Sequence, residues 1–181
     1  MRSLFGRWHT MYNSKELSHI TNMQRIDAIL HDEKFCYGLE RIVALEHDRI
    51  FCRHDLSHLL DVARIAWIMV LENNLDIKKD IVYGAALLHD LGRYRQYEEA
   101  IPHALASAEL AEQILPAAGY TNQETTWIVN AIREHGVEPQ EQGQLARILY
   151  DADKLSRNCF DCAAQAECKW PKSKRNRTIV Y

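Results

Sequence analysis

The sequence of 181 residues has few glycines and prolines, 7 and 4 respectively. Scarce helix breakers and a hydrophobic fraction of 47% are typical of a mostly helical globular domain. No apolar run reaches the roughly 18 residues of a membrane helix, and the first residues lack the apolar segment of a signal peptide. We therefore expect one cytoplasmic domain with short extensions and no membrane anchor.

The sequence also lacks an excess of positive charge, with 22 Lys and Arg against 25 Asp and Glu. The formal net charge is −3, which argues against a general attraction to nucleic acid or membranes. The five cysteines are an odd number, and in a reducing compartment they predict free thiols or metal ligands rather than a disulfide framework. The nine histidines are many for this length and matter only if they converge. The sequence does not indicate an oligomeric state.

Apolar periodicity predicts an all-α fold. The arm 1–22 has no clear period, a helical domain spans 23–158, and a Cys-containing, basic extension covers 159–181. Spacing and capping residues predict helices over 21–30, 34–46, 53–73, 76–91, 102–116, 121–135 and 145–158. Residues 93–101 and 137–143 are predicted to be polar loops, the first placed where it could cover a site.

The chain is organised around the stretch 85–92, an apolar run that ends in His89 and Asp90 and stops at Gly92. At helical spacing His89 shares a stripe with Ala85 and Val82, so it is expected to point inward. Four further ligand-type residues also fall on apolar helix faces: His58, His103, His135 and Asp153. A single inward His is more often a core residue bonded to a carbonyl. Four imidazoles and two carboxylates, however, carry a desolvation cost that one divalent ion would offset.

Three segments carry a family resemblance: His58-x3-Val62-Ala63, Ala86-Leu87-Leu88-His89-Asp90-Leu91-Gly92, and Asp151-Ala152-Asp153-Lys154-Leu155. Over about residues 50–158 the chain resembles the HD-domain metal-dependent phosphohydrolases. The resemblance implies an all-helical HD-domain bundle in which His58, His89, Asp90 and Asp153 bind one metal. It also implies a possible second ion on His103 and His135, with Asp90 as the bridge. The cofactor is then one or two divalent ions per chain, chosen from Mn, Fe, Mg, Co, Ni and Zn.

This resemblance implies hydrolysis of a small phosphorylated metabolite, with a nucleotide as the leading expectation, by metal-activated water. Besides Asp90, the candidate catalytic residues are Arg93 and Lys154, which could bind phosphate oxygens, and His54, which could relay a proton. Arg93 stands where the family often has Lys. Arg93 and Lys154 could equally be surface cations, and His54 an outward or capping residue. Two alternative functions are a di-iron oxygenase on the same ligands and a non-catalytic metal- or nucleotide-binding regulator.

The segment Cys159-x2-Cys162-x5-Cys168 follows the last predicted helix. Three thiols at this spacing could hold a second, soft-metal centre of zinc or iron and sulfur, but a closed zinc site needs four ligands. Cys36, Cys52 or a histidine would have to supply the fourth. Otherwise these thiols are small buried hydrophobes. The basic residues after Cys168 are expected to form a solvated end.

Overall fold

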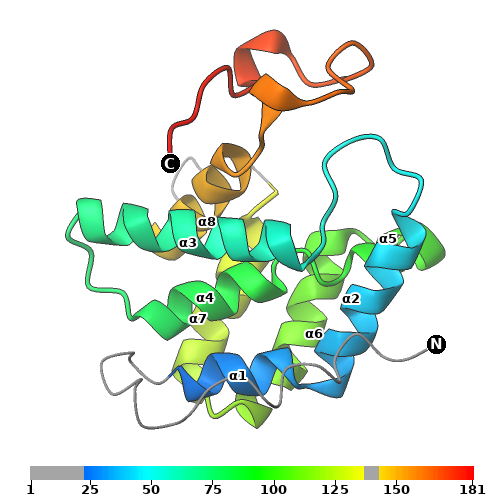
Figure 1. Cartoon of the computed structure of the whole chain (residues 1–181). Helices are drawn as coiled ribbons and strands as arrows, with labels where there is room; N and C mark the ends of the chain where they lie inside the picture. The colour runs from blue at the N-terminus through cyan, green and yellow to red at the C-terminus, as the bar shows by residue number, and fades with distance from the viewer. Residues whose placement is uncertain (1–22, 137–142) are drawn as a thin grey trace, which may run out of the picture.

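The computed structural model describes residues 23–136 and 143–181 of the chain. Within these ranges every regular element is a helix, which confirms the all-α expectation (Figure 1). The predicted N-terminal arm, the Thr21 cap and most of the loop predicted over 137–143 lie outside the described residues. The α-helices are α1 (Gln24–Leu30), α2 (Glu33–Leu45), α3 (Leu56–Glu72), α4 (Lys79–Leu88), α5 (Arg93–Glu99), α6 (His103–Ala117), α7 (Asn122–Glu134) and α8 (Gln144–Leu155).

Helix α4 lies at the centre of the bundle. Seven of its ten residues are buried, and it packs against α1, α3, α6, α7 and α8. Helix α3 is buried along Leu59, Val62 and Ala66 and packs against α4 and α8. These helices share one continuous core of Leu, Ile, Val and Ala side chains. The central position of α4 explains why the apolar run before His89 has no polar face.

Side-chain caps fix the beginnings of several helices. Asp55 caps α3 by accepting a hydrogen bond from the backbone N–H of His58 at 3.2 Å. At α7 the capping box predicted from Thr121 and Glu124 is present in both directions.

Several predicted boundaries and one predicted loop are wrong. Helix α4 begins at Lys79 without a side-chain cap, not at Asp76. Helix α3 begins at Leu56, so His54 precedes the helix instead of lying one turn along it. Residues 93–99 form helix α5 rather than a loop. The sequence of α5 is polar and shows no helical pattern of apolar residues. The helix is held instead by tertiary contacts such as the edge-to-face packing of Tyr94 on Tyr37 of α2.

Because α8 ends at Leu155, the C-terminal extension covers residues 156–181 instead of the predicted 159–181. Its regular structure is two three-residue 3-10 turns, η2 (Cys159–Asp161) and η3 (Lys172–Lys174). The extension lies at one end of the molecule, opposite α1, and faces the loop between α2 and α3 (Figure 1). Asn176 attaches it to α8 by donating hydrogen bonds to the carbonyls of Lys154, Leu155 and Arg157 at 2.8–3.2 Å. None of the described helices is long and apolar enough to cross a membrane.

Candidate metal centre

The candidate ligands stand at helix ends that meet at one end of α4. His58 is in the first turn of α3, and His103 is the first residue of α6. His89 and His135 follow the last residues of α4 and α7 as their C-caps. Asp90 comes directly after His89, and Asp153 lies in the last turn of α8. The structure therefore brings together six residues from five separate helix ends.

These six residues form two groups that share Asp90. His58, His89, Asp90 and Asp153 offer ligand atoms that all lie within 4.8 Å of one another, and so do Asp90, His103 and His135. Asp90 Oδ2 is 3.6 Å from Nε2 of His58 and 3.3 Å from Nε2 of His89. Its other oxygen, Oδ1, is 3.5 Å from Nε2 of His103 and 3.6 Å from Nε2 of His135. Each carboxylate oxygen thus faces a different pair of imidazoles.

The opposite ring nitrogens are held by acceptors. His89 Nδ1 donates to the carbonyl of Ala86, and His135 Nδ1 to the carbonyl of Ile132, both at 2.6 Å. His103 Nδ1 lies 2.8 Å from the side-chain oxygen of Gln96. A proton on Nδ1 leaves the lone pair of a neutral imidazole on Nε2, pointing at the shared centre. His58 is held more loosely, with Nδ1 3.4 Å from Oγ of Ser156.

The unpaired atoms at this centre fit a cation. Of six buried side-chain polar atoms without a hydrogen-bond partner in the described residues, four are ligand atoms: Nε2 of His58, Nε2 of His89 and both carboxylate oxygens of Asp90. Asp90 is only 1% exposed and His89 is fully buried. Each orphaned buried polar group costs roughly 1–3 kcal/mol, and a buried charge costs more. A divalent ion bound by imidazole and carboxylate removes this cost for all of them together.

The electrostatics keep these groups in the form that binds metal. Burial alone would raise the pKa of Asp90, but His89 and Arg93 outweigh it and hold that pKa well below its usual range. Burial likewise opposes ionisation of Asp153, while Lys154 and His89 lower its pKa overall. Desolvation and nearby Arg93 lower the pKa of His103 to about 4. At neutral pH the carboxylates are therefore ionised and His103 is neutral.

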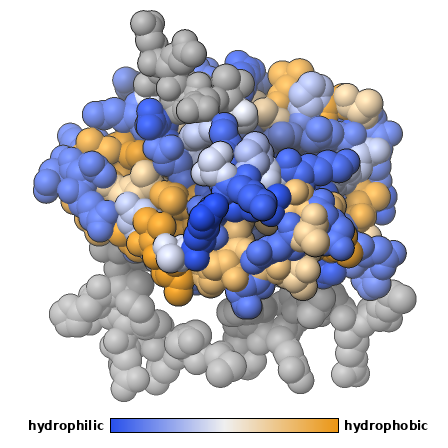
Figure 2. Space-filling view, turned by 90° about the horizontal axis from the view of Figure 1, so that it is seen from above, coloured by the Kyte–Doolittle hydropathy of each residue, from blue (hydrophilic) through white to orange (hydrophobic). Residues whose placement is uncertain are grey.

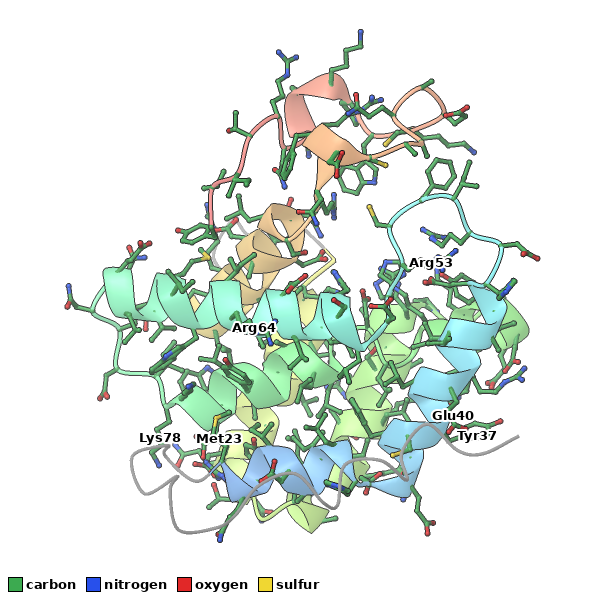
Figure 3. The ribbon with its side chains drawn as sticks, in the orientation of Figure 1. Met23, Tyr37, Glu40, Arg53, Arg64 and Lys78 are labelled. Carbon is green, nitrogen blue, oxygen red and sulfur yellow. The ribbon has the colours of Figure 1, made fainter. Side chains whose placement is uncertain are left out.

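A cavity of about 650 Å³ opens directly beside this centre. His54, His58 and Asp153 form its inner wall, and the extension forms part of its outer wall. Its cationic lining comprises Arg49, Arg53, Arg93, Arg157, Lys169 and Arg175, against carboxylates at Asp55, Asp61, Asp153 and Asp161. Figure 3 shows Arg53 in the loop before α3, below the extension. The face that carries the extension is mostly hydrophilic with separate apolar patches (Figure 2).

His54 stands at the edge of this cavity in an arrangement that the sequence does not reveal. Its Nδ1 is 2.6 Å from Oε1 of Glu46, and its backbone N–H donates to Oε2 of Glu46 at 2.8 Å. Tyr97 donates its hydroxyl to the same carboxylate at 2.5 Å. Nε2 of His54 lies 3.8 Å from Asp90 Oδ2. The sequence does not predict that Glu46 contacts His54 or Tyr97. The only sequence signal for Tyr97 was the expectation that residues 93–101 could cover a site.

The other candidate residues are placed as follows. Arg93 lines the cavity with Nε 2.9 Å from Asp90 Oδ1. Lys154 pairs with Asp153, whereas Arg157, which sequence reasoning missed, lines the cavity and lies 3.5 Å from Asp153 Oδ2. Asp151 binds Arg147 at 2.7 Å, on the other side of α8 from the cluster.

The structure is an all-helical domain with a buried cluster of imidazoles and carboxylates that could hold metal ions. The HD domain family matches residues 55–158, more than half of the sequence, and the chain belongs to this family. A solved structure of a predicted HD superfamily hydrolase from an uncultured Thermotogales bacterium has the same fold. Its TM-score is 0.60 at 22% identity, over 91% of this chain and 87% of that one.

Two further kinds of relative differ in how much of their own length matches this chain. An uncharacterized protein of Clostridium beijerinckii is 42% identical over 159 residues, which is 88% of this chain and 100% of that protein. Ribonuclease Y of Mycoplasma mycoides is 30% identical over 101 residues, or 56% of this chain and 18% of that protein. Ribonuclease Y of Nitratidesulfovibrio vulgaris is 31% identical over 112 residues, or 62% and 20%. This chain therefore spans about a fifth of the length of these ribonucleases.

Proposed function

We propose that this protein is a divalent-metal-dependent phosphohydrolase acting on a small phosphorylated metabolite, with a nucleotide as the first candidate. The observation that supports it is Asp90, whose two oxygens each face a different imidazole pair beside a cavity rich in Arg and Lys. Membership in the HD domain family supports the same reaction class.

In this proposal His58, His89, Asp90 and Asp153 hold one ion, and Asp90, His103 and His135 hold a second. Bound divalent ions supply Lewis acidity, which activates water at neutral pH and offsets charge on phosphate oxygens. The Nδ1 hydrogen bonds of His89 and His135 fix the rings so that the ligand geometry precedes substrate binding.

Arg93 and Arg157 are the cations that we assign to the phosphate oxygens. Both line the cavity, and each stands next to a ligand carboxylate. Guanidinium donors match phosphate geometry and stabilise charge that grows in the transition state. Lys154 pairs with Asp153 and does not line the cavity, so we assign to Arg157 the phosphate contact that the sequence suggested for Lys154.

We assign proton transfer to His54. Desolvation lowers its pKa and outweighs the hydrogen bond to Glu46, so the ring is neutral at pH 7 with Nε2 toward Asp90. The Glu46 carboxylate on Nδ1 stabilises the charged ring when Nε2 takes up a proton. His54→Gln is expected to lower kcat about 10²–10⁴-fold and to remove one limb of the pH profile while metal content stays unchanged.

The test is a hydrolysis screen with Mn²⁺, Mg²⁺, Co²⁺ and Fe²⁺ on nucleotides, generic phosphomonoesters and a short RNA. Turnover of a phosphomonoester that is lost in Asp90→Asn supports the proposal. Turnover of RNA alone would instead favour the activity named by the ribonuclease Y relatives. Oxygen uptake by iron-loaded protein without hydrolysis would favour the oxygenase alternative. Stoichiometric metal without any turnover would favour a regulator.

A further inference from the structure

Four of the five cysteines line the cavity that opens beside the imidazole–carboxylate centre. Cys52, in the loop before α3, lines the same cavity as Cys159, Cys162 and Cys168 of the extension. Cys36 is not among them, since it lies on α2 and its Sγ donates to the carbonyl of Leu30 at 3.4 Å. All five cysteines are free thiols. The structure thus selects Cys52 as the fourth thiol of the set.

The backbone around these thiols is held by side chains of the cavity wall. Arg49 donates to the carbonyl of Cys52 at 2.8 Å, and Gln165 to that of Cys159 at 2.6 Å. Arg175 donates to the carbonyl of Cys168 at 2.7 Å. Burial raises the pKa of the Cys52 thiol, Arg157 opposes this shift, and Cys159 and Cys162 raise the pKa further, so these three side chains lie near Cys52.

The extension lacks a core that would hold it in this shape. From residue 156 to residue 181 only Ala164 is a buried hydrophobic residue, and the regular structure is limited to η2 and η3. A segment of this size cannot offset its conformational entropy with so little buried apolar surface. Small segments of this kind are commonly held by a metal or by disulfides, and these cysteines are free thiols.

We propose that Cys52, Cys159, Cys162 and Cys168 form a second metal centre, a tetrathiolate site for a thiophilic metal, either zinc or an iron–sulfur cluster. The number of ligands and the C-x2-C spacing match closed metal sites built from four cysteines. In the described part of the chain, the ligand atoms of the two imidazole–carboxylate groups lie within 4.8 Å of one another, and the four thiols are farther apart than that. Binding therefore draws the extension toward the loop before α3, and each thiol that becomes a ligand releases one proton.

The surroundings suit a negatively charged centre. Four thiolates around one divalent ion leave two excess negative charges, and Arg49, Arg53, Arg157, Lys169 and Arg175 line the same cavity. Arg157 also stacks on Trp170, with its guanidinium carbon 4.1 Å from the ring centroid. The centre would clamp the extension onto the loop that carries His54 and so close the outer wall of the cavity.

Elemental analysis of protein purified without added metal tests this proposal independently of turnover. We expect one equivalent of zinc, or iron with acid-labile sulfide and visible absorption, that persists in the His58→Ala/Asp90→Ala double variant. Cys52→Ser and the Cys159→Ser/Cys162→Ser double variant should lose this metal. Cys36→Ser is the matched control and should retain it. Loss of the same metal in Cys36→Ser, or its retention in the cavity variants, would contradict the proposal.

Thiol accessibility of the wild-type protein gives a second measurement that needs no variant to fold. We expect one thiol, Cys36, to react with a thiol reagent in the native protein, and four more after a strong chelator is added. Rapid reaction of all five thiols together with absence of thiophilic metal would overturn the proposal. Protection that is relieved by a reductant but not by a chelator would also overturn it, because it would indicate disulfides. Failure of the phosphohydrolase screen would leave both measurements unaffected.

Discussion

Gly92, next to the candidate metal centre, is the described glycine at which an added Cβ would lie closest to other atoms. It lies between Asp90 and Arg93 and caps α5. A Cβ at this position would lie 2.3 Å from the backbone N of Ser107 and 2.6 Å from the backbone carbonyl carbon of Ala106. These atoms belong to the backbone of α6 and cannot move aside as a flexible side chain could. Its φ of −78° is ordinary, so the effect of Gly92→Ala is steric alone.

The size of the effect follows from the contact distances. Carbon atoms in contact are about 3.5–4.0 Å apart, so α6 must move by roughly 1 Å or more. Overpacking of this kind costs about 1–3 kcal/mol. The movement also breaks the buried hydrogen bond from Gly92 N–H to Ser107 Oγ, now 2.8 Å long, which costs about 1–3 kcal/mol more. We expect Gly92→Ala to lower the free energy of unfolding by about 2–6 kcal/mol.

Urea unfolding measures this change, and bound metal per chain reports the displacement of Asp90 from its imidazoles. Gly136→Ala is the control, because a Cβ there meets no atom of the described residues within 4 Å and the φ of Gly136 is not positive. The free energy of unfolding of the control should lie within about 0.5 kcal/mol of the wild-type value. A Gly92→Ala protein that matched the control in both stability and metal content would refute the steric reasoning.

Three further predictions concern single side chains. Asp90→Asn should lose metal from both groups while its far-ultraviolet circular dichroism stays helical, and retention of two ions would contradict the shared-carboxylate geometry. Burial opposes ionisation of Glu46, but the interactions with His54 and Tyr97 together outweigh it and lower the pKa of Glu46 to about 2. The contribution of Glu46 to stability is therefore complete above about pH 4.5 and is lost as the pH falls toward 2. The difference in unfolding free energy between wild type and Glu46→Gln should therefore shrink over that range, and a constant difference would contradict the pKa shift. Ser107→Ala leaves the buried N–H of Gly92 without an acceptor and should cost about 1–3 kcal/mol in urea unfolding, against a near-neutral result if water replaces the hydroxyl.

Periodicity finds the candidate ligands because the buried stripe of a helix extends past its last helical residue. The sequence places His89 and His135 inside helices, yet both are C-caps that retain right-handed helical backbone angles. Their side chains therefore stay in line with the buried faces of α4 and α7. Spacing also separates the two carboxylates of α8: Arg147, one turn before Asp151, binds Asp151, whereas Asp153 shares the buried face and lies at the cluster.

The surroundings of the ligands are beyond the reach of the sequence because they depend on contacts between distant segments. Glu46 reaches His54 across the loop before α3, and Tyr97 reaches Glu46 from α5, a helix whose polar sequence predicts a loop. Arg157 enters the cavity because α8 ends at Leu155, whereas the predicted helix continues to residue 158. No local pattern encodes these positions, which follow from the packing of complete helices.

The direction of the helices explains why the centre stands at the end of the bundle. The C-termini of α4, α7 and α8 carry the negative ends of helix dipoles and unpaired carbonyls, and all three point toward the ligand cluster. His89 and His135 use Nδ1 to satisfy one such carbonyl each, so a single hydrogen bond both completes the helix end and aims Nε2 at the centre. The positive dipole ends at the N-termini of α3 and α6 also lie at this cluster and offset part of that field, so a cation there would be stabilised mainly by its ligands. In mid-helix the carbonyls are already bonded along the helix, and a histidine would have to find another acceptor to hold its ring.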